Sequence, residues 1–159
     1  MSLENLTYIN LGFRAATSFG ELDRIRLGQE VSHVLIKDAH DMLHSANLAI
    51  DITLRDKEAG KLFGMKDSCG NELSEYLLLF IDEFDRTKMS AGTKEEKIKI
   101  EHRFNEVLFH LKEAENCLDN LLLGNEVSSK SLEKTASIFK YVSNKCLTMY
   151  KVPSGCWPI

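Results

Sequence analysis

Proline is absent from residues 1–152 of this chain, because its two prolines, Pro153 and Pro158, both lie near the carboxyl end. A proline ring removes a backbone hydrogen bond and clashes with the preceding helical turn, so it interrupts helices. The proline-free stretch can therefore form long helices throughout. An apolar content of 43% beside 28% charged residues is typical of a globular chain, so these helices have a core to bury.

The clearest helical pattern lies between residues 93 and 125. Apolar residues recur there at alternating steps of four and three, at Ile100, Phe104, Val107, Leu111, Ala114, Leu118 and Leu121. Thr93 and Glu96 form a capping-box pattern at the start, and Gly124 suits the end of the helix. A helix over 129–151 is predicted by the same spacing at Leu132, Ala136, Phe139, Val142, Cys146 and Met149.

Two earlier helices are predicted. Ser18 and Glu21 match a capping box, which predicts a long helix from there to about Lys57, after a short helix or arm. Its apolar stripe comprises Val31, Leu35, Ala39, Met42, Leu43, Ala46, Ala49 and Ile50. Residues 60–71 read as a connection, a helix over 72–86 carries an apolar centre at 76–81, and 87–92 form a turn. No strand and no internal repeat is predicted.

These patterns predict an all-α fold, an antiparallel helical bundle of four main helices with a possible extra short N-terminal helix. Helices joined by short turns pack as antiparallel neighbours. We expect one helical-bundle domain over 1–152 and a C-terminal tail over 153–159.

The charge pattern bears on partners. The net charge is −4, and lysines and arginines are interspersed with acidic residues, which makes nucleic acid an unlikely partner. No apolar run approaches the roughly 20 residues that span a bilayer, so no membrane partner is expected. The start of the chain lacks a signal-peptide pattern, and the cysteines are widely spaced, which suits reduced thiols. The prediction is a cytoplasmic protein without a cofactor.

Histidines are the first candidates for chemistry. Three of them share one side of the predicted helix that contains them, facing away from its apolar stripe, and Glu30 with His33 matches the Glu-x-x-His pattern of di-iron bundles. A second group follows at four-residue spacing on the next long helix. The alternative of a metal site would use His33, His40, His44, His102, Glu106 and His110.

Residues 39–48 resemble the phosphorylated-histidine helix of histidine phosphotransfer domains, which are helical bundles with a solvent-facing histidine. The resemblance implies that His40 accepts phosphate, with His33 and His44 on the same side of the helix. That family has a lysine and a glycine where Leu43 and His44 stand in this chain.

Arg103 and His110 form an Arg-x6-His pattern that resembles the signature of HEPN-type helical ribonucleases. The resemblance implies metal-free chemistry, with His110 as general acid or base and Arg103 on the phosphate. The polar residue that usually follows the arginine is replaced here by Phe104. This alternative needs Arg103 and His110 to line one cleft.

The tail carries the chain's single tryptophan. Trp157 and Ile159 would form a small apolar anchor for a partner, and the alternative is that Trp157 folds back on its own bundle. The function favoured by the sequence is a non-enzymatic interaction or regulatory protein, such as an adaptor, inhibitor or immunity-type factor. It would act through its surface, on a protein partner or by self-association.

Overall fold

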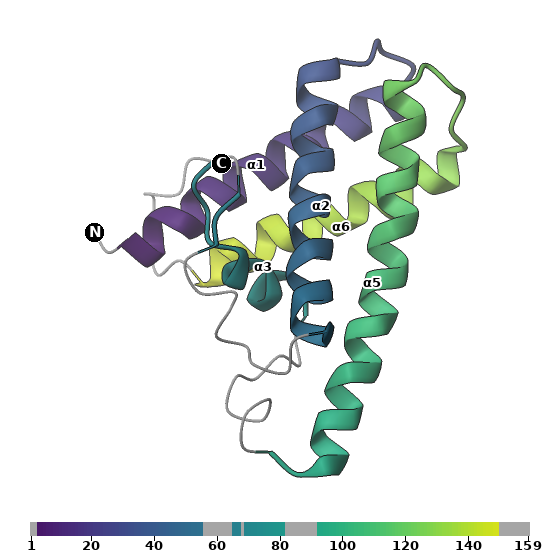
Figure 1. Ribbon diagram of the computed structural model, residues 1–159. Helices are drawn as coiled ribbons and strands as arrows, with labels where there is room; N and C mark the ends of the chain where they lie inside the picture. Colours follow the sequence, from purple (N-terminus) through teal and green to yellow (C-terminus); the bar gives the residue numbers. More distant parts are fainter. Residues whose placement is uncertain (1–2, 56–64, 68, 82–91, 150–159) are drawn as a thin grey trace. The chain divides into compact units, whose positions relative to one another are not determined.

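The computed structural model describes residues 3–55, 65–67, 69–81 and 92–149 (Figure 1). This part of the chain holds five helices and no strand, with one isolated antiparallel bridge between Lys66 and Glu72. The predicted all-α helical bundle is confirmed. The helices are α1 (Leu3–Arg26), α2 (His33–Arg55), α3 (Leu73–Phe80), α5 (Lys94–Leu122) and α6 (Ser129–Met149).

The chain divides into two compact units. Unit 1 takes its residues from 1–40 and 117–159, and unit 2 is formed from 41–116. The helices α2 and α5 contribute residues to both units. A single domain over 1–152 stays a prediction.

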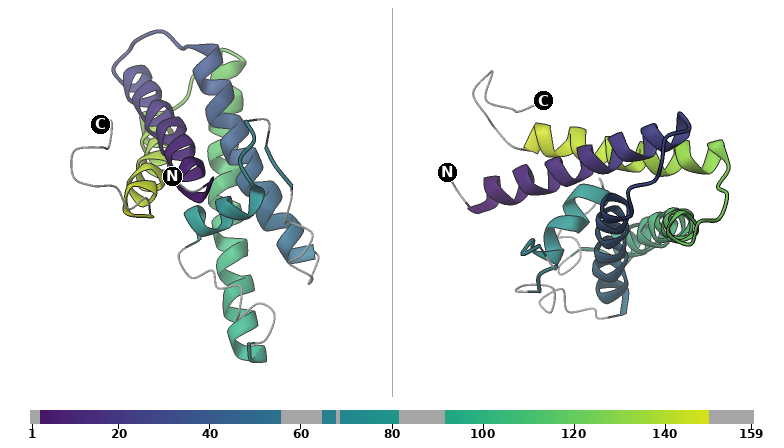
Figure 2. Two further views of the ribbon diagram at one scale, coloured as in Figure 1. Left: turned by 90° about the vertical axis from the view of Figure 1, so that its left-hand side faces the viewer. Right: turned by 90° about the horizontal axis from the view of Figure 1, so that it is seen from above.

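Unit 1 is built around the pair α1 and α6, which lie side by side and run in opposite directions (Figure 2). Leu11, Ala15 and Leu22 of α1 are fully buried. On α6 the predicted core positions Phe139 and Val142 are also fully buried. Burying two apolar stripes against each other is the main source of stability for such a pair.

The first helix differs from the prediction. A helix from Ser18 to about Lys57 is wrong, because α1 runs through Ser18 and ends at Arg26, and α2 begins at His33. Ser18 is buried at a core position of α1, and its Oγ donates to the carbonyl of Arg14 at 2.9 Å. A serine bonded to the carbonyl four residues back is a helix-interior residue and not a cap. Residues 56–64 lie outside the described residues.

Unit 2 contains the later part of α2, the short helix α3 and most of α5. The predicted stripe of α2 is buried in this unit, at Met42, Leu43, Ala46, Ala49 and Ile50. The prediction that residues 76–81 are buried on nearly all sides is confirmed for Tyr76, Leu77, Leu79, Phe80 and Ile81. The helix does not continue toward residue 86, because Ile81 already has extended backbone angles. Residues 82–91 lie outside the described residues.

The predicted ends of the last two helices are confirmed where the structure describes them. Thr93 Oγ1 accepts the backbone N–H of Glu96 at 3.2 Å, so it caps α5 as predicted. Gly124, the second residue after α5, has a φ of 78°. Helix α6 ends at Met149, and residues 150–159 lie outside the described residues.

Candidate functional site

The histidines predicted to share one side of α2 have different surroundings. In unit 1, His40 is half-buried, and its Nε2 lies 2.9 Å from Oδ1 of Asp119 on α5. The prediction that these histidines all face away from the packed part of the protein is therefore wrong for His40. His33 is exposed, as predicted.

In unit 2, His44 is exposed and its Nδ1 lies 4.0 Å from Oε1 of Glu115. The same carboxylate accepts a hydrogen bond from Nδ2 of Asn47, a buried residue one turn further along α2. A carboxylate that holds two side chains of the neighbouring helix is a packing contact. The hydrogen bond between Asn47 and Glu115 therefore joins α2 to α5, and His44 lies at its edge.

Arg103 and His110 both lie on α5 in unit 2. Arg103 is half-buried, and its Nη1 lies 3.3 Å from Oε1 of Glu106, one turn further along the helix. His110 is exposed, with its ring edge-on to Phe109 at 5.7 Å between centroids. A phosphate would have to compete with Glu106 for the guanidinium group. The ribonuclease alternative stays a prediction.

The metal alternative gains no support from the geometry. His102, Glu106 and His110 are all exposed on α5. In the part of the chain that the structure describes, no three side chains of histidine, cysteine, aspartate or glutamate are placed to hold a metal ion together. The phosphotransfer alternative for His40 is untested, although the contact with Asp119 occupies one of its ring nitrogens.

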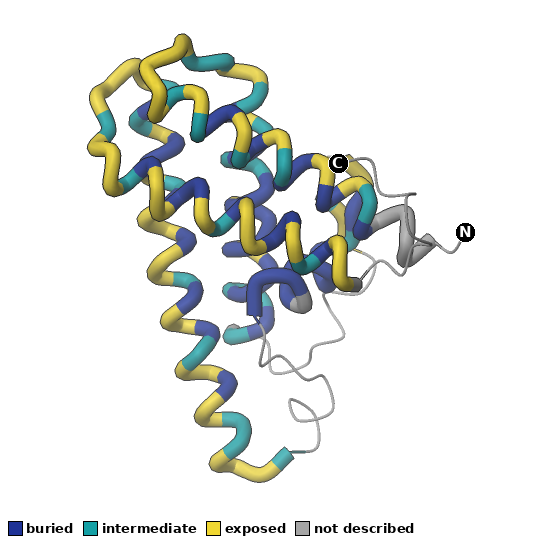
Figure 3. Tube along the Cα trace, turned by 180° about the vertical axis from the view of Figure 1, so that it is seen from behind, coloured by how far each residue is buried: buried dark blue, intermediate teal, exposed yellow. Residues whose placement is uncertain are grey.

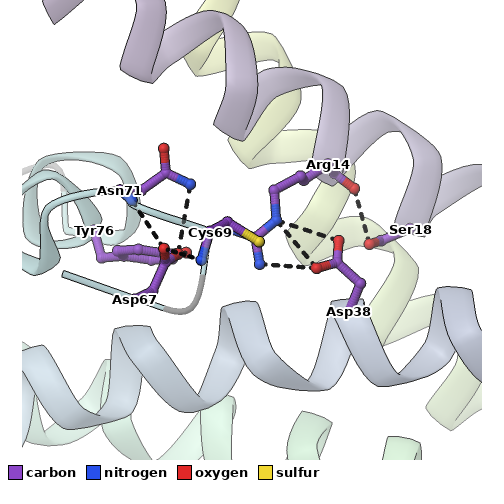
Figure 4. A network of polar contacts seen from close by, with 7 residues as sticks. All are labelled: Arg14, Ser18, Asp38, Asp67, Cys69, Asn71 and Tyr76. Carbon is purple, nitrogen blue, oxygen red and sulfur yellow. Dashed lines mark hydrogen bonds and ion pairs between the residues drawn. The ribbon is translucent and has the colours of Figure 1, made fainter.

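A partly buried ion pair joins α1 to α2 within unit 1. Arg14 is 8% exposed, and its Nη2 donates to Oδ1 of Asp38 at 2.9 Å (Figure 4). Its Nε lies 3.2 Å from both carboxylate oxygens. Such a fork of donors on one carboxylate fixes the geometry of both groups. We assign it a structural role.

A second polar cluster lies in unit 2, just before α3. The carboxylate of Asp67 accepts the backbone N–H groups of Cys69 and Asn71, each at 2.9 Å, and the hydroxyl of Tyr76 (Figure 4). An aspartate that accepts the N–H two residues ahead forms an Asx turn. The buried hydroxyl of Tyr76 thereby gains a partner, so this cluster also has a structural role.

The most distinctive feature of unit 1 is a duplicated turn. Residues 27–32, between α1 and α2, read Leu-Gly-Gln-Glu-Val-Ser. Residues 123–128, between α5 and α6, read Leu-Gly-Asn-Glu-Val-Ser. The prediction that the chain has no internal repeat is therefore wrong. The repeat was missed because the capping-box interpretation placed residues 27–32 inside a helix.

The two copies share their backbone geometry as well as their sequence. Gly28 has a φ of 87° and Gly124 a φ of 78°, the left-handed region that glycine tolerates best. In both copies the glycine N–H and the next N–H donate back to the last helical turn. These bonds are Gly28 to Ile25 at 2.9 Å, Gln29 to Arg24 at 3.1 Å, Gly124 to Leu121 at 3.2 Å and Asn125 to Asn120 at 2.9 Å. This is the Schellman motif, twice.

The end of each copy starts the next helix. Ser128 Oγ accepts the N–H of Ser131 at 3.2 Å, so it caps α6. Ser32 holds the matching place before α2, where its N–H donates to Oε1 of the buried Glu21 at 2.8 Å. The half-buried valines Val31 and Val127 precede these serines, as in a hydrophobic staple. The glycine, the valine and the serine of each copy therefore each have a role in forming the turn or starting the next helix.

The leucine and the glutamate of each copy have no such structural role, because their side chains are exposed. Leu27 is 69% exposed and Leu123 is 75% exposed, and Val34, just after the first copy, is 79% exposed. Glu30 and Glu126 are exposed as well. We call these five residues the turn surface.

The two copies lie side by side at one end of unit 1, and both are largely exposed (Figures 1 to 3). Nη1 of Arg26, next to the first copy, reaches Oε1 of Glu133 on α6 at 3.3 Å. The two turns thus belong to one region of unit 1. A comparison of the two turn sequences would have located it.

No family model matches the chain, and no curated protein or solved structure is significantly similar to it. Among the described residues, no helix has the length and hydropathy of a membrane-spanning segment. Trp157 and Ile159, predicted to bind a partner, lie outside the described residues.

Proposed function

We propose that this chain is a non-enzymatic interaction protein of the regulatory or adaptor kind, which binds protein through the turn surface of unit 1. The observation that carries the proposal is the exposure of Leu27 and Leu123 at matched positions of two near-identical turns. An apolar side chain in water gains stability when a partner covers it. Exposed leucines gathered at one end of a unit are typical of an interaction site.

The candidate catalytic groups offer less support to an enzymatic role. Arg103 already pairs with Glu106, and His40 already contacts Asp119. Catalysis requires groups that converge on a substrate, in a site that water can leave. The turn surface instead combines exposed aliphatic groups with exposed charges, which suits contact with another protein.

We also propose that the protein acts in the cytoplasm. The free cysteines Cys117 and Cys146 are buried, which is compatible with the reducing conditions of the cytoplasm. An adaptor, an inhibitor or an immunity-type factor would all use the same surface.

Affinity capture from an extract of the native host tests the proposal. The bait is the full chain, beside a variant that carries Leu27→Glu and Leu123→Glu together. Phe109→Glu is the matched control, because Phe109 is 61% exposed on α5 in unit 2. We expect one protein to be captured by the wild type and the control and lost with the double variant. The proposal is contradicted if the double variant captures the protein as well as the wild type does, or if no protein is captured at all.

A parallel bait without residues 153–159 tests the tail. If Trp157 and Ile159 form the anchor, deletion removes the captured protein while the double leucine variant retains it. The reverse outcome supports the turn surface. The two surfaces are therefore distinguished in one experiment.

A further inference from the structure

We infer that the exposed side of α6 binds a short acidic segment of a partner protein. This site is separate from the turn surface and does not use its leucines. The inference starts from the charge of α6, which carries four lysines and one glutamate in a chain whose net charge is −4. The glutamate, Glu133, is paired with Arg26 at 3.3 Å. The other charged side chains of α6 are all positive.

Three of the lysines share one side of α6. Lys130 and Lys134 are exposed, and Lys145 is half-buried. At 100° per residue, the three side chains leave the helix within about 60° of one another. The core residues Phe139 and Cys146 lie on the opposite side of α6 and are fully buried. We call Lys130, Lys134 and Lys145 the basic face.

The charges of the basic face do not stabilise α6. Lys130 lies in the first turn of the helix, which contains no acidic residue, and a cation there opposes the helix dipole. Lys134 follows four residues later, at the spacing where like charges repel each other. No acidic side chain among the described residues forms an ion pair with Lys130 or Lys134. By contrast, Lys140 packs on α1, with its Nζ 5.7 Å from the centroid of the Phe19 ring.

The duplicated turn provides an internal comparison for these lysines. Helix α2 follows the first turn as α6 follows the second, so their residues can be matched by counting from Ser32 and Ser128. The core positions agree, since the buried Leu43 of α2 matches the buried Phe139 of α6. The residues of α2 that match the basic face are Val34, Asp38 and Ala49. Lysine is therefore not required at these positions by the helix that follows the turn.

Charge complementarity assigns an acidic ligand to the basic face. The face extends from Lys130 to Lys145, about 22 Å at 1.5 Å per residue, which a short acidic peptide segment can follow. A nucleic acid fits less well, because α6 has no arginine to bind phosphate with two parallel bonds. The exposed ring of Tyr141 is also in contact with Nζ of Lys145, at 5.8 Å from its centroid, which hinders the stacking of a base. The carboxylates of a protein segment are therefore the expected ligands.

Binding of a fluorescent oligo-glutamate peptide to the full chain, measured by anisotropy at low ionic strength, tests the inference. The test variant carries Lys130→Gln, Lys134→Gln and Lys145→Gln. The matched control carries Lys94→Gln, Lys99→Gln and Lys112→Gln, which alter the net charge equally at exposed positions of α5. We expect the test variant to raise the dissociation constant of the peptide by about tenfold or more, and the control to bind like the wild type. Added salt should weaken the binding of the wild type.

Thermal unfolding followed by circular dichroism separates a binding role from a structural one. The test variant should unfold at the temperature of the wild type or above it, because the replaced lysines oppose the helix dipole and repel each other. Unfolding at a clearly lower temperature would assign these lysines to the fold and overturn the inference.

A wild type that does not bind the peptide also overturns the inference, as does a control variant that loses as much binding as the test variant. Binding of oligo-uridylate RNA or of phosphatidylserine vesicles, without binding of the peptide, would show that the basic face takes phosphate groups and not a protein segment. Each of these results is separable from the proposed function, because capture of a host protein through Leu27 and Leu123 does not require the basic face.

Discussion

Leu27 and Leu123 occupy the same position in two copies of one turn, each directly before a glycine with a positive φ. Each leucine directly follows the last residue of a helix, and its side chain is largely exposed to water. The backbone hydrogen bonds of the turn and the start of the next helix are supplied by the residues around it. The residues that fold each turn are thus distinct from the leucine that it exposes.

Alanine at Gly28 or Gly124 should lower the free energy of unfolding by about 1–2 kcal/mol, because a Cβ is strained at positive φ. A Cβ at either position meets no other group within 4 Å, so backbone conformation is the only cause. Gly20→Ala is the control, since Gly20 lies inside α1 with open space around it. There alanine should stabilise the protein by about 0.5–1 kcal/mol. Urea denaturation measures all three, and a harmless Gly28→Ala contradicts the turn geometry.

Asp38→Asn should destabilise unit 1. The substitution removes the carboxylate that holds the buried guanidinium of Arg14, and an uncompensated buried charge is costly. Since the side chain of Asp38 is 35% exposed, solvent moderates the loss, and we expect about 1–2 kcal/mol. Asp23→Asn is the comparison, because the pair of Asp23 and Arg26 is far more exposed and should contribute less to stability than the pair of Asp38 and Arg14. Equal losses in the two variants would argue against a structural role for Arg14.

The described cysteines should differ in reactivity. Burial raises the pKa of the Cys117 thiol, against a smaller lowering by a hydrogen bond with Thr135, and burial raises that of Cys146 to about 12. Since the thiolate is the reactive form, both should resist alkylation in the folded protein, whereas the exposed Cys69 should react. Mass spectrometry after brief iodoacetamide treatment locates the label. Modification of Cys146 as fast as Cys69 would contradict the burial of Cys146.

The raised pKa of Cys146 also implies a loss of stability at alkaline pH. The unfolded thiol ionises near its ordinary pKa of 9.0, while the folded one keeps its proton up to about 12. The contribution of the Cys146 thiol to the free energy of unfolding is therefore fully present below about pH 9. It is lost as the pH rises toward 12. The advantage of the wild type over Cys146→Ala should shrink by about 1 kcal/mol between about pH 8 and about pH 10. A constant difference between the two proteins would contradict the shift.

Most helices could be predicted because apolar residues recur in them at helical spacing. The stripe from Ile100 to Leu121 is apolar at every core position, and Gly124 marks the end of α5. In α1 the signal is weaker, since Ser18 fills a core position that the stripe would give to an apolar residue. A buried serine followed by Glu21 imitates a helix start, although Glu21 in fact accepts the N–H of Ser32.

The candidate site was less predictable, for a different reason. The spacing of His40 and His44 fixes their side of α2, but not which groups of α5 come to face that side. Asp119 and Glu115 are distant in sequence, so the contacts with them arise only when the helices pack. The duplicated turn was visible in the sequence. The exposure of its leucines was not, because an apolar residue at a helix end can equally be buried.

We propose that this protein meets its partner at the end of unit 1 formed by the two turns. Backbone amide spectra of the full chain, recorded by nuclear magnetic resonance with and without the host protein that the affinity capture isolates, locate the contact. We expect the shifts caused by that protein to be concentrated in residues 27–34 and 123–130. Shifts centred on the face of α5 that carries Ile98 and Phe109, with residues 27–34 and 123–130 unchanged, would show that the partner binds elsewhere.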